Sequence, residues 1–92
     1  MKPVLSVLLI EDDPNVRLGC EQAMQLAGIP VIAVASAEEG QRQLDADFAG
    51  IVVTDMRLPG MDGMALLRWV NQLTPDLPVI IITGHGDVTL AV

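Results

Sequence analysis

Four short apolar runs, separated by stretches of helical periodicity, limit the fold of this chain more than any other feature. The runs lie at about Val4–Ile10, Pro30–Val34, Gly50–Thr54 and Val79–Thr83. Three of them are uninterrupted Val, Ile and Leu sequences, which is typical of strands that are buried on both faces. Strands of this kind that alternate with helices form a parallel sheet with helices on both sides. We therefore predict an α/β fold with a doubly wound parallel sheet.

The first connection carries clear helix signals. Asp13 followed by Pro14 predicts a helix N-cap with proline at the first helical position, and Gly28 predicts the end of this helix. Apolar or small residues recur at helical spacing between these points, so we expect them to face the sheet. These residues are Val16, Cys20, Ala23 and Ala27.

Two further helices are predicted from their first turns. Ser36 followed by Glu39 forms a capping-box pattern, and we expect a short helix from there to about Asp47. Asp62 predicts the N-cap of a third helix that ends before Pro75. The apolar stripe of this third helix consists of Leu66, Leu67, Val70 and Leu73.

The size and charge of the chain exclude several classes of protein. The 92 residues allow one domain at most. A formal net charge of −7 has the wrong sign for a surface that binds nucleic acid, so we expect no direct nucleic-acid binding. The apolar runs are far shorter than the roughly 20 residues that a membrane span requires, so we expect no membrane partner. Cys20 is the only cysteine, which excludes an intrachain disulfide and fits a cytoplasmic location.

Polar and acidic residues stand directly after the predicted strands. Glu11, Asp12 and Asp13 follow the first strand, Asp55 follows the third, and Thr83 ends the fourth. Because functional groups of an open parallel sheet gather at the carboxyl ends of the strands, we expect these residues to converge. Clustered carboxylates repel one another unless a proton or a cation neutralises them, and Mg²⁺ prefers such oxygen ligands. The alternative is that each acidic residue is only a loop residue or a helix cap.

Three segments of the chain resemble the receiver domains of two-component response regulators. They read VLLIEDD at residues 7–13, IVVTDMRLPGMDG at 51–63 and VIIITGHGDV at 79–88. The resemblance covers the whole chain and implies a flavodoxin-like receiver fold with strand order 2-1-3-4. The residues of the second and third segments are also similar to those of receivers of enhancer-binding transcriptional activators, particularly regulators of dicarboxylate transport.

The resemblance implies a role for each residue of the acidic site. Asp55 would accept a phosphoryl group from a sensor histidine kinase, and Glu11, Asp12, Asp55 and the backbone carbonyl of Arg57 would hold Mg²⁺. Thr83 would be the switch hydroxyl that responds to phosphorylation; as an alternative, it is only a β-branched residue at a strand end. The chain would then be a signalling domain rather than an enzyme, and its transcriptional output would lie outside these residues.

The chain departs from the family pattern at its C-terminal side. Receivers of this family continue into a fifth strand with a lysine that contacts the phosphoryl group, but no lysine follows Lys2 here. We therefore expect residues 1–92 to form an incomplete receiver, with Asp87–Val92 beginning a helix. Strand Val79–Thr83 would be an exposed apolar edge, and an edge of this kind favours self-association.

Two other functions fit parts of the sequence. A receiver without the lysine could be a phosphorylation-independent dimerisation or interaction module. An aspartyl-phosphate hydrolase also uses an Asp after an apolar strand, but those enzymes need a second Asp two positions later, where this chain has Arg57.

Overall fold

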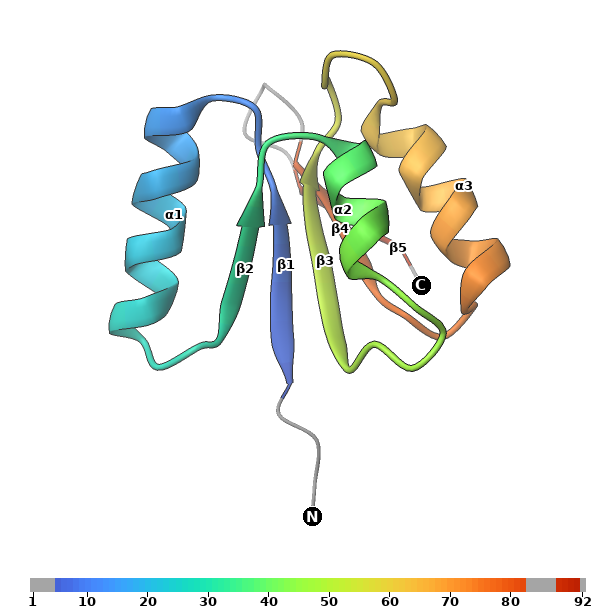
Figure 1. Ribbon diagram of the computed structural model, residues 1–92, viewed down its shortest axis with the longest axis horizontal. Coiled ribbons are helices and arrows are strands. Elements are labelled where there is room, and N and C mark those ends of the chain that lie inside the picture. Colours follow the sequence, from blue (N-terminus) through green and yellow to red (C-terminus); the bar gives the residue numbers. More distant parts are fainter. Residues whose placement is uncertain (1–4, 83–87, 92) are drawn as a thin grey trace.

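The computed structural model describes residues 5–82 and 88–91, and it contains one sheet with helices on both faces (Figure 1). The strands are β1 (Ser6–Ile10), β2 (Val31–Val34), β3 (Gly50–Asp55), β4 (Val79–Ile82) and β5 (Val88–Ala91). The helices are α1 (Pro14–Leu26), α2 (Ala37–Gln43) and α3 (Gly63–Leu73). Within the described part of the chain, no helix is long and apolar enough to cross a membrane.

The sheet has the strand order β2-β1-β3-β4-β5. The first four strands in this order run parallel, with Val7 opposite Val31 and Ile51, and Val53 opposite Ile80. Parallel order 2-1-3-4 and the doubly wound α/β class are therefore confirmed. Because β1, β2 and β3 point the same way, the loops that follow them lie at one edge of the sheet, at the top of Figure 1.

The last strand contradicts the expectation of a helix beginning within residues 87–92. The backbone of Val88–Ala91 pairs antiparallel with β4, with Ile80 opposite Leu90 and Ile82 opposite Val88. An unpaired strand edge offers free N–H and C=O groups. This segment includes the β-branched residues Val88 and Thr89 and lies close enough along the chain to pair with them. The prediction that β4 is an exposed edge is wrong for the same reason. The family's parallel fifth strand is absent from the described residues.

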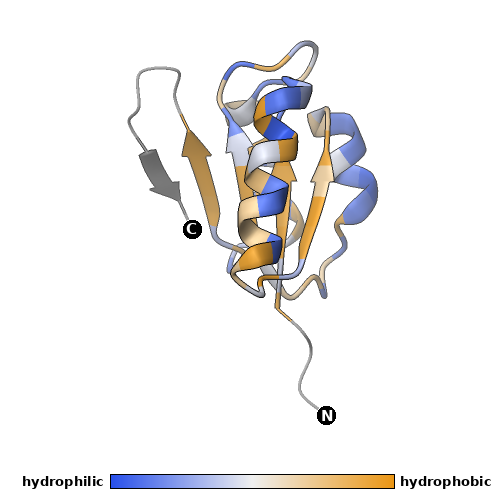
Figure 2. Ribbon diagram, turned by 90° about the vertical axis from the view of Figure 1, so that its left-hand side faces the viewer, coloured by the Kyte–Doolittle hydropathy of each residue, from blue (hydrophilic) through white to orange (hydrophobic). Residues whose placement is uncertain are grey.

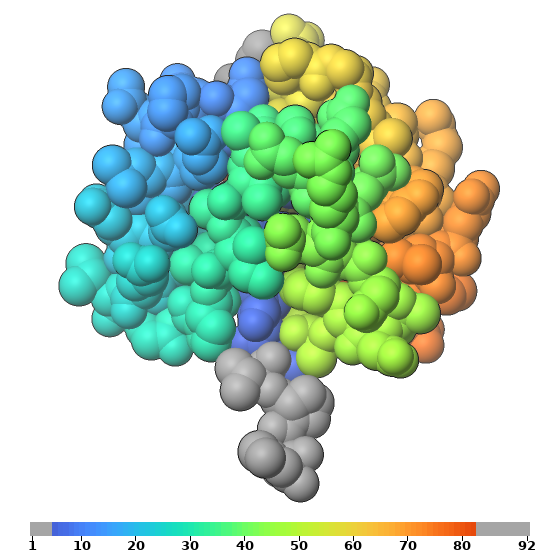
Figure 3. Space-filling view, viewed as in Figure 1, coloured from blue at the N-terminus to red at the C-terminus, as the bar shows by residue number. Residues whose placement is uncertain are grey.

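The main core lies between the sheet and helices α2 and α3. It contains Leu8 and Ile10 of β1, Val52 of β3, and Leu66 and Val70 of α3, and all five side chains are among the largest that are fully buried. The expected stripe of α3 is confirmed, since Leu67 and Leu73 also pack against this cluster. Figure 3 shows this side of the molecule, with α2 at the centre and α3 beside it.

The predicted caps are confirmed at all three helices. Asp13 accepts hydrogen bonds from the N–H groups of Asn15 and Val16, Ser36 accepts one from Glu39, and Asp62 accepts one from Ala65. The second helix is shorter than expected, because it ends at Gln43 and Leu44 turns its side chain into the main core. Burial of Leu44 therefore ends α2 before the predicted Asp47.

Helix α1 covers the opposite face of the sheet less completely. Cys20 and Met24 pack against a smaller cluster formed by Val7, Leu9 and Val53, but no residue of α1 is fully buried. The predicted stripe is only partly correct, since Val16 is 47 % exposed. Figure 2 shows α1 in front of the apolar strands, with polar and apolar residues intermixed along it. This side of the sheet therefore keeps accessible apolar surface.

Candidate functional site at the carboxyl edge of the sheet

Three carboxylates from two neighbouring strands meet at the carboxyl edge of the sheet. Glu11 directly follows β1 and Asp55 is the last residue of β3, and the two strands pair in register up to Ile10 and Thr54. Carboxylate oxygens of Glu11, Asp12 and Asp55 all lie within 4.8 Å of one another. Asp12 is exposed, whereas Glu11 and Asp55 are half-buried. The edge therefore combines a dense negative charge with access from solvent.

Backbone and side-chain hydrogen bonds hold the first of these residues in place. The guanidinium of Arg17 donates to the Glu11 carbonyl oxygen at 2.8 Å, and the Glu11 N–H donates to the Val34 carbonyl at 3.1 Å. The Asp13 N–H donates to Glu11 Oε2 at 3.1 Å. These hydrogen bonds hold the turn between β1 and α1 that carries Asp12.

The surroundings of Glu11 in the cluster change the pKa of its carboxyl group. Partial burial raises the pKa of its carboxyl above the ordinary value, and a hydrogen bond with the Asp12 side chain and the charges of Asp55 and Asp12 raise it further. The hydrogen bond from the Asp13 N–H opposes this rise. A group that resists ionisation beside two other carboxylates marks a place where added positive charge is favourable. These oxygen donors fit a hard divalent cation such as Mg²⁺.

The segment between β3 and α3, residues 56–62, is called the acceptor loop here. Its ends are fixed by backbone hydrogen bonds, since the Met56 N–H donates to Ile82 O at 3.0 Å and the Gly63 N–H donates to Met56 O at 2.9 Å. Below it, the buried Thr54 hydroxyl donates to the Asp55 carbonyl at 3.0 Å. Asp55 therefore stands at a rigid junction of β3, β4 and α3.

Comparison with known protein families agrees with this arrangement. The model of the response regulator receiver domain matches residues 7–92. The chain belongs to the response regulator receiver domain family. It is 52 % identical to the C4-dicarboxylate transport transcriptional regulatory protein DctD of Rhizobium meliloti over 92 residues, which cover all of this chain and 20 % of that protein.

Two further relatives support the same family. DctD of Pseudomonas aeruginosa is 52 % identical over 90 residues, which are 94 % of this receiver and 19 % of that protein. A receiver domain structure from Clostridium thermocellum superposes with a TM-score of 0.83 at 33 % identity, covering 90 % of this chain and 68 % of that one. The receiver spans about a fifth of the length of the curated relatives it matches.

The structure brings together most of the residues that the sequence singled out. Glu11, Asp12 and Asp55 form the cluster, and Arg57 lies on the acceptor loop with an exposed side chain. Thr83, the predicted switch hydroxyl, lies outside the described residues. One contact of this receiver was missed, namely a hydrogen bond from Met61 on the acceptor loop to Glu38 on α2. The capping-box pattern explained Glu39 and gave no sign of a second role for its neighbour.

Proposed function

We propose that Asp55 is the phosphoacceptor of this receiver and that its donor is a phosphohistidine on a sensor histidine kinase. The observation that carries this proposal is the cluster of Glu11, Asp12 and Asp55 at the carboxyl edge of a receiver fold. Asp55 is half-buried, so its carboxylate is held by the sheet and still open to a partner. The output is proposed to be transcriptional, because the DctD relatives are transcriptional regulators by name.

The proposed chemistry is a transfer between two nucleophiles. An Asp55 carboxylate oxygen forms a bond to phosphorus while the bond between phosphorus and the imidazole nitrogen breaks. The electron pair of that bond stays on the imidazole, and the product is an acyl phosphate on Asp55. In this scheme the domain promotes the transfer from the kinase to its own Asp55, so we propose a signalling domain and not an enzyme with a separate substrate. Thr83 keeps its predicted role as the switch hydroxyl.

The same residues are proposed to hold Mg²⁺, namely Glu11, Asp12, Asp55 and the backbone carbonyl of Arg57. A bound divalent cation would supply the positive charge that three carboxylates and an incoming phosphoryl group need. The rigid Glu11 turn and the fixed ends of the acceptor loop orient these oxygens beforehand. Asp13 is left to cap α1.

Phosphoramidate with Mg²⁺, followed by intact-mass measurement, tests the phosphoacceptor function. The supporting result is a gain of one phosphoryl group per chain that is lost on treatment with hydroxylamine, which cleaves acyl phosphates. A label that resists hydroxylamine would show that the group is not on a carboxylate.

Mg²⁺ is expected to raise the melting temperature of the chain, and Asp12→Asn is expected to remove most of that rise. A ligand at 100 times its Kd stabilises a fold by about 2.7 kcal/mol. Without Mg²⁺, Asp12→Asn is expected to melt at a higher temperature than the unchanged chain. Removing one of three like charges relieves repulsion on the order of 1 kcal/mol in a water-like surrounding. Thermal melts with and without Mg²⁺ measure both effects.

The control for this experiment is Asp76→Asn, because Asp76 is an exposed carboxylate on the loop between α3 and β4. This variant has the same change of net charge and is expected to keep the full Mg²⁺ response. An equal response in Asp12→Asn and in the control would contradict a metal site at the carboxylate cluster.

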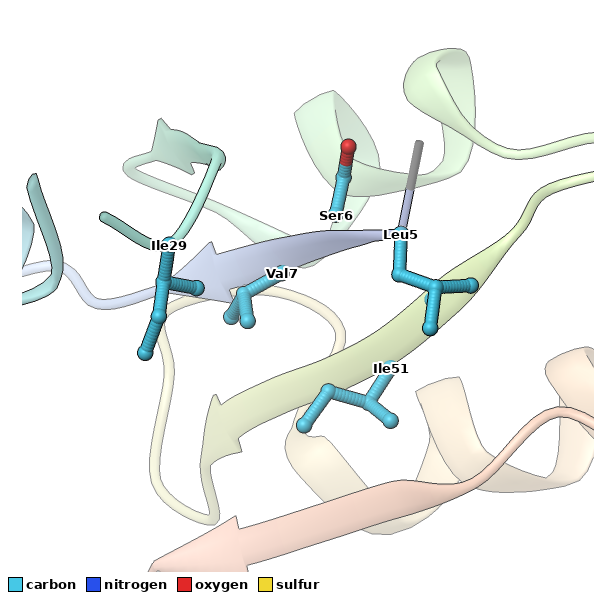
Figure 4. A pocket seen from close by; sticks show the side chains of 6 residues that line it. Leu5, Ser6, Val7, Ile29 and Ile51 are labelled. Atoms are coloured by element: carbon cyan, nitrogen blue, oxygen red, sulfur yellow. The ribbon is translucent and has the colours of Figure 1, made fainter. Parts of the chain in front are cut away.

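We also propose that the chain self-associates through the face that α1 covers incompletely. A groove of about 240 Å³ lies beside β1 and β3, with Leu5, Val7, Ile29 and Ile51 among its lining residues. Figure 4 shows the side chains of Val7 and Ile51 on the same side of the sheet, with Ser6 directed to the other side. Leu5 is 69 % exposed, so its apolar side chain is in contact with solvent in the monomer.

Light scattering over a range of concentrations tests the self-association. Leu5→Asp is expected to shift the chain toward monomer, since it places a charge at the groove. Leu26→Asp is the control, because Leu26 is 90 % exposed and does not line the groove. A monomeric mass for the unchanged chain at every concentration would rule out the proposal.

Two broader assignments complete the proposed function. The chain spans 68 % of the Clostridium thermocellum receiver structure, which supports the interpretation of residues 1–92 as the N-terminal portion of a receiver domain. A reducing cytoplasm is proposed as its location, since a single cysteine and a kinase partner both fit that compartment.

A further inference from the structure

Glu38, in the first turn of α2, reaches the acceptor loop from a different part of the chain. The Met61 N–H donates to Glu38 Oε2 at 3.3 Å, across 23 positions of sequence. Within residues 5–82, this is the only hydrogen bond that the acceptor loop donates to a side chain of another element. A contact of this range connects α2 to the loop that follows Asp55.

The backbone of the neighbouring Gly60 lies against the same carboxylate. Its φ is +77°, a conformation that favours glycine, and a Cβ placed there would lie 2.8 Å from Glu38 Oε2. Both carboxylate oxygens approach this position, because Glu38 Oε1 would be 3.6 Å from the same point. The turn therefore presents the Cα of Gly60 and the N–H of Met61 together to Glu38.

This contact holds the part of the acceptor loop that backbone hydrogen bonds leave free. Those bonds fix Met56 and Gly63 at the two ends. Between them, Leu58 and Met61 pack against the main core through apolar contacts, which do not define the direction of a carbonyl. Glu38 supplies a directional contact in this region, because it accepts a hydrogen bond from the N–H of Met61, four positions after Arg57.

We propose that Glu38 is a positioning residue that fixes the acceptor loop and thereby orients the Arg57 carbonyl for Mg²⁺. The link to Mg²⁺ rests on the function proposed above for the acidic cluster. Glu38 contacts neither the ion nor the phosphoryl group, and it acts only through the loop backbone. Its effect depends on a hydrogen-bond acceptor at this position and not on the negative charge.

Two variants of Glu38 separate the effect of its hydrogen-bond acceptor from the effect of its negative charge. Glu38→Ala removes both, whereas Glu38→Gln removes the charge and keeps a carbonyl oxygen that can accept from Met61. Asp76→Ala is the control for loss of an exposed carboxylate away from the loop. Amide exchange at Met61, measured by NMR without metal, reports the contact itself. Calorimetric titration with Mg²⁺ reports its consequence at the site.

Glu38→Ala is expected to speed Met61 exchange and to weaken Mg²⁺ binding, each about two- to fivefold, the effect expected for the loss of one exposed hydrogen bond. Glu38→Gln and Asp76→Ala are expected to stay close to the unchanged chain in both measurements. Unchanged Met61 exchange in Glu38→Ala would overturn the proposal, as would equal weakening of Mg²⁺ binding by Ala and Gln. Faster Met61 exchange in a chain that never binds Mg²⁺ would support Glu38 as the loop's positioning residue and overturn the metal site instead.

Discussion

Asp55→Asn is expected to take up no phosphoryl group from phosphoramidate and Mg²⁺, under conditions that label the unchanged chain. The amide has nearly the shape of the carboxylate, so the fold around β3 should remain intact. It lacks the anionic oxygen that attacks phosphorus, so the effect should be complete loss and not a slower rate. Intact-mass measurement after incubation reads the result directly.

Two further variants make this experiment specific. Asp76→Asn carries the same charge change on an exposed loop residue and is expected to label normally. Asp12→Asn keeps the acceptor but loses a proposed metal ligand, so its labelling should be slower and depend less on Mg²⁺. Label that persists in Asp55→Asn would show that another residue is the acceptor. Absence of label in the unchanged chain would contradict phosphotransfer by these 92 residues alone.

Gly63→Ala is expected to destabilise the fold by about 1–3 kcal/mol, the usual cost of overpacking. A Cβ at this first residue of α3 would lie 2.6 Å from the Asp55 carbonyl oxygen and 3.0 Å from Met56 Cα. Both are backbone atoms, so they cannot move aside without shifting the end of β3. A loss of this size lowers the melting temperature by roughly 4–8 °C per kcal/mol in a domain of this length.

The same substitution should also weaken Mg²⁺ binding, because the clash lies at the junction that carries Asp55. Gly19→Ala is the matched control, since Gly19 lies within α1 and a Cβ there would meet nothing within 4 Å. Alanine is the better helix former, so this control should be as stable as the unchanged chain or more stable by up to about 1 kcal/mol. Equal melting temperatures for Gly63→Ala and the unchanged chain would show that α3 can move away from β3 at little cost.

Features that depend on neighbouring residues could be predicted from the sequence. The parallel strands follow from short Val, Ile and Leu runs, and the caps at Asp13, Ser36 and Asp62 follow from side chains that bond to N–H groups two or three positions later. The meeting of Glu11 and Asp55 could also be predicted, because parallel strands end at one edge whatever the details of their packing.

Tertiary structure alone decided three other features. Val88–Ala91 became a strand because β4 offered a free edge, and a segment of four residues has too little local preference to decide for itself. The orientation of α1, with Val16 turned toward solvent, depends on which part of the sheet the helix meets. The contact from Glu38 to Met61 joins residues 23 positions apart, so no local pattern could indicate it. The sequence by itself determined the acidic site, whereas the support of the loop beside it exists only in the folded chain.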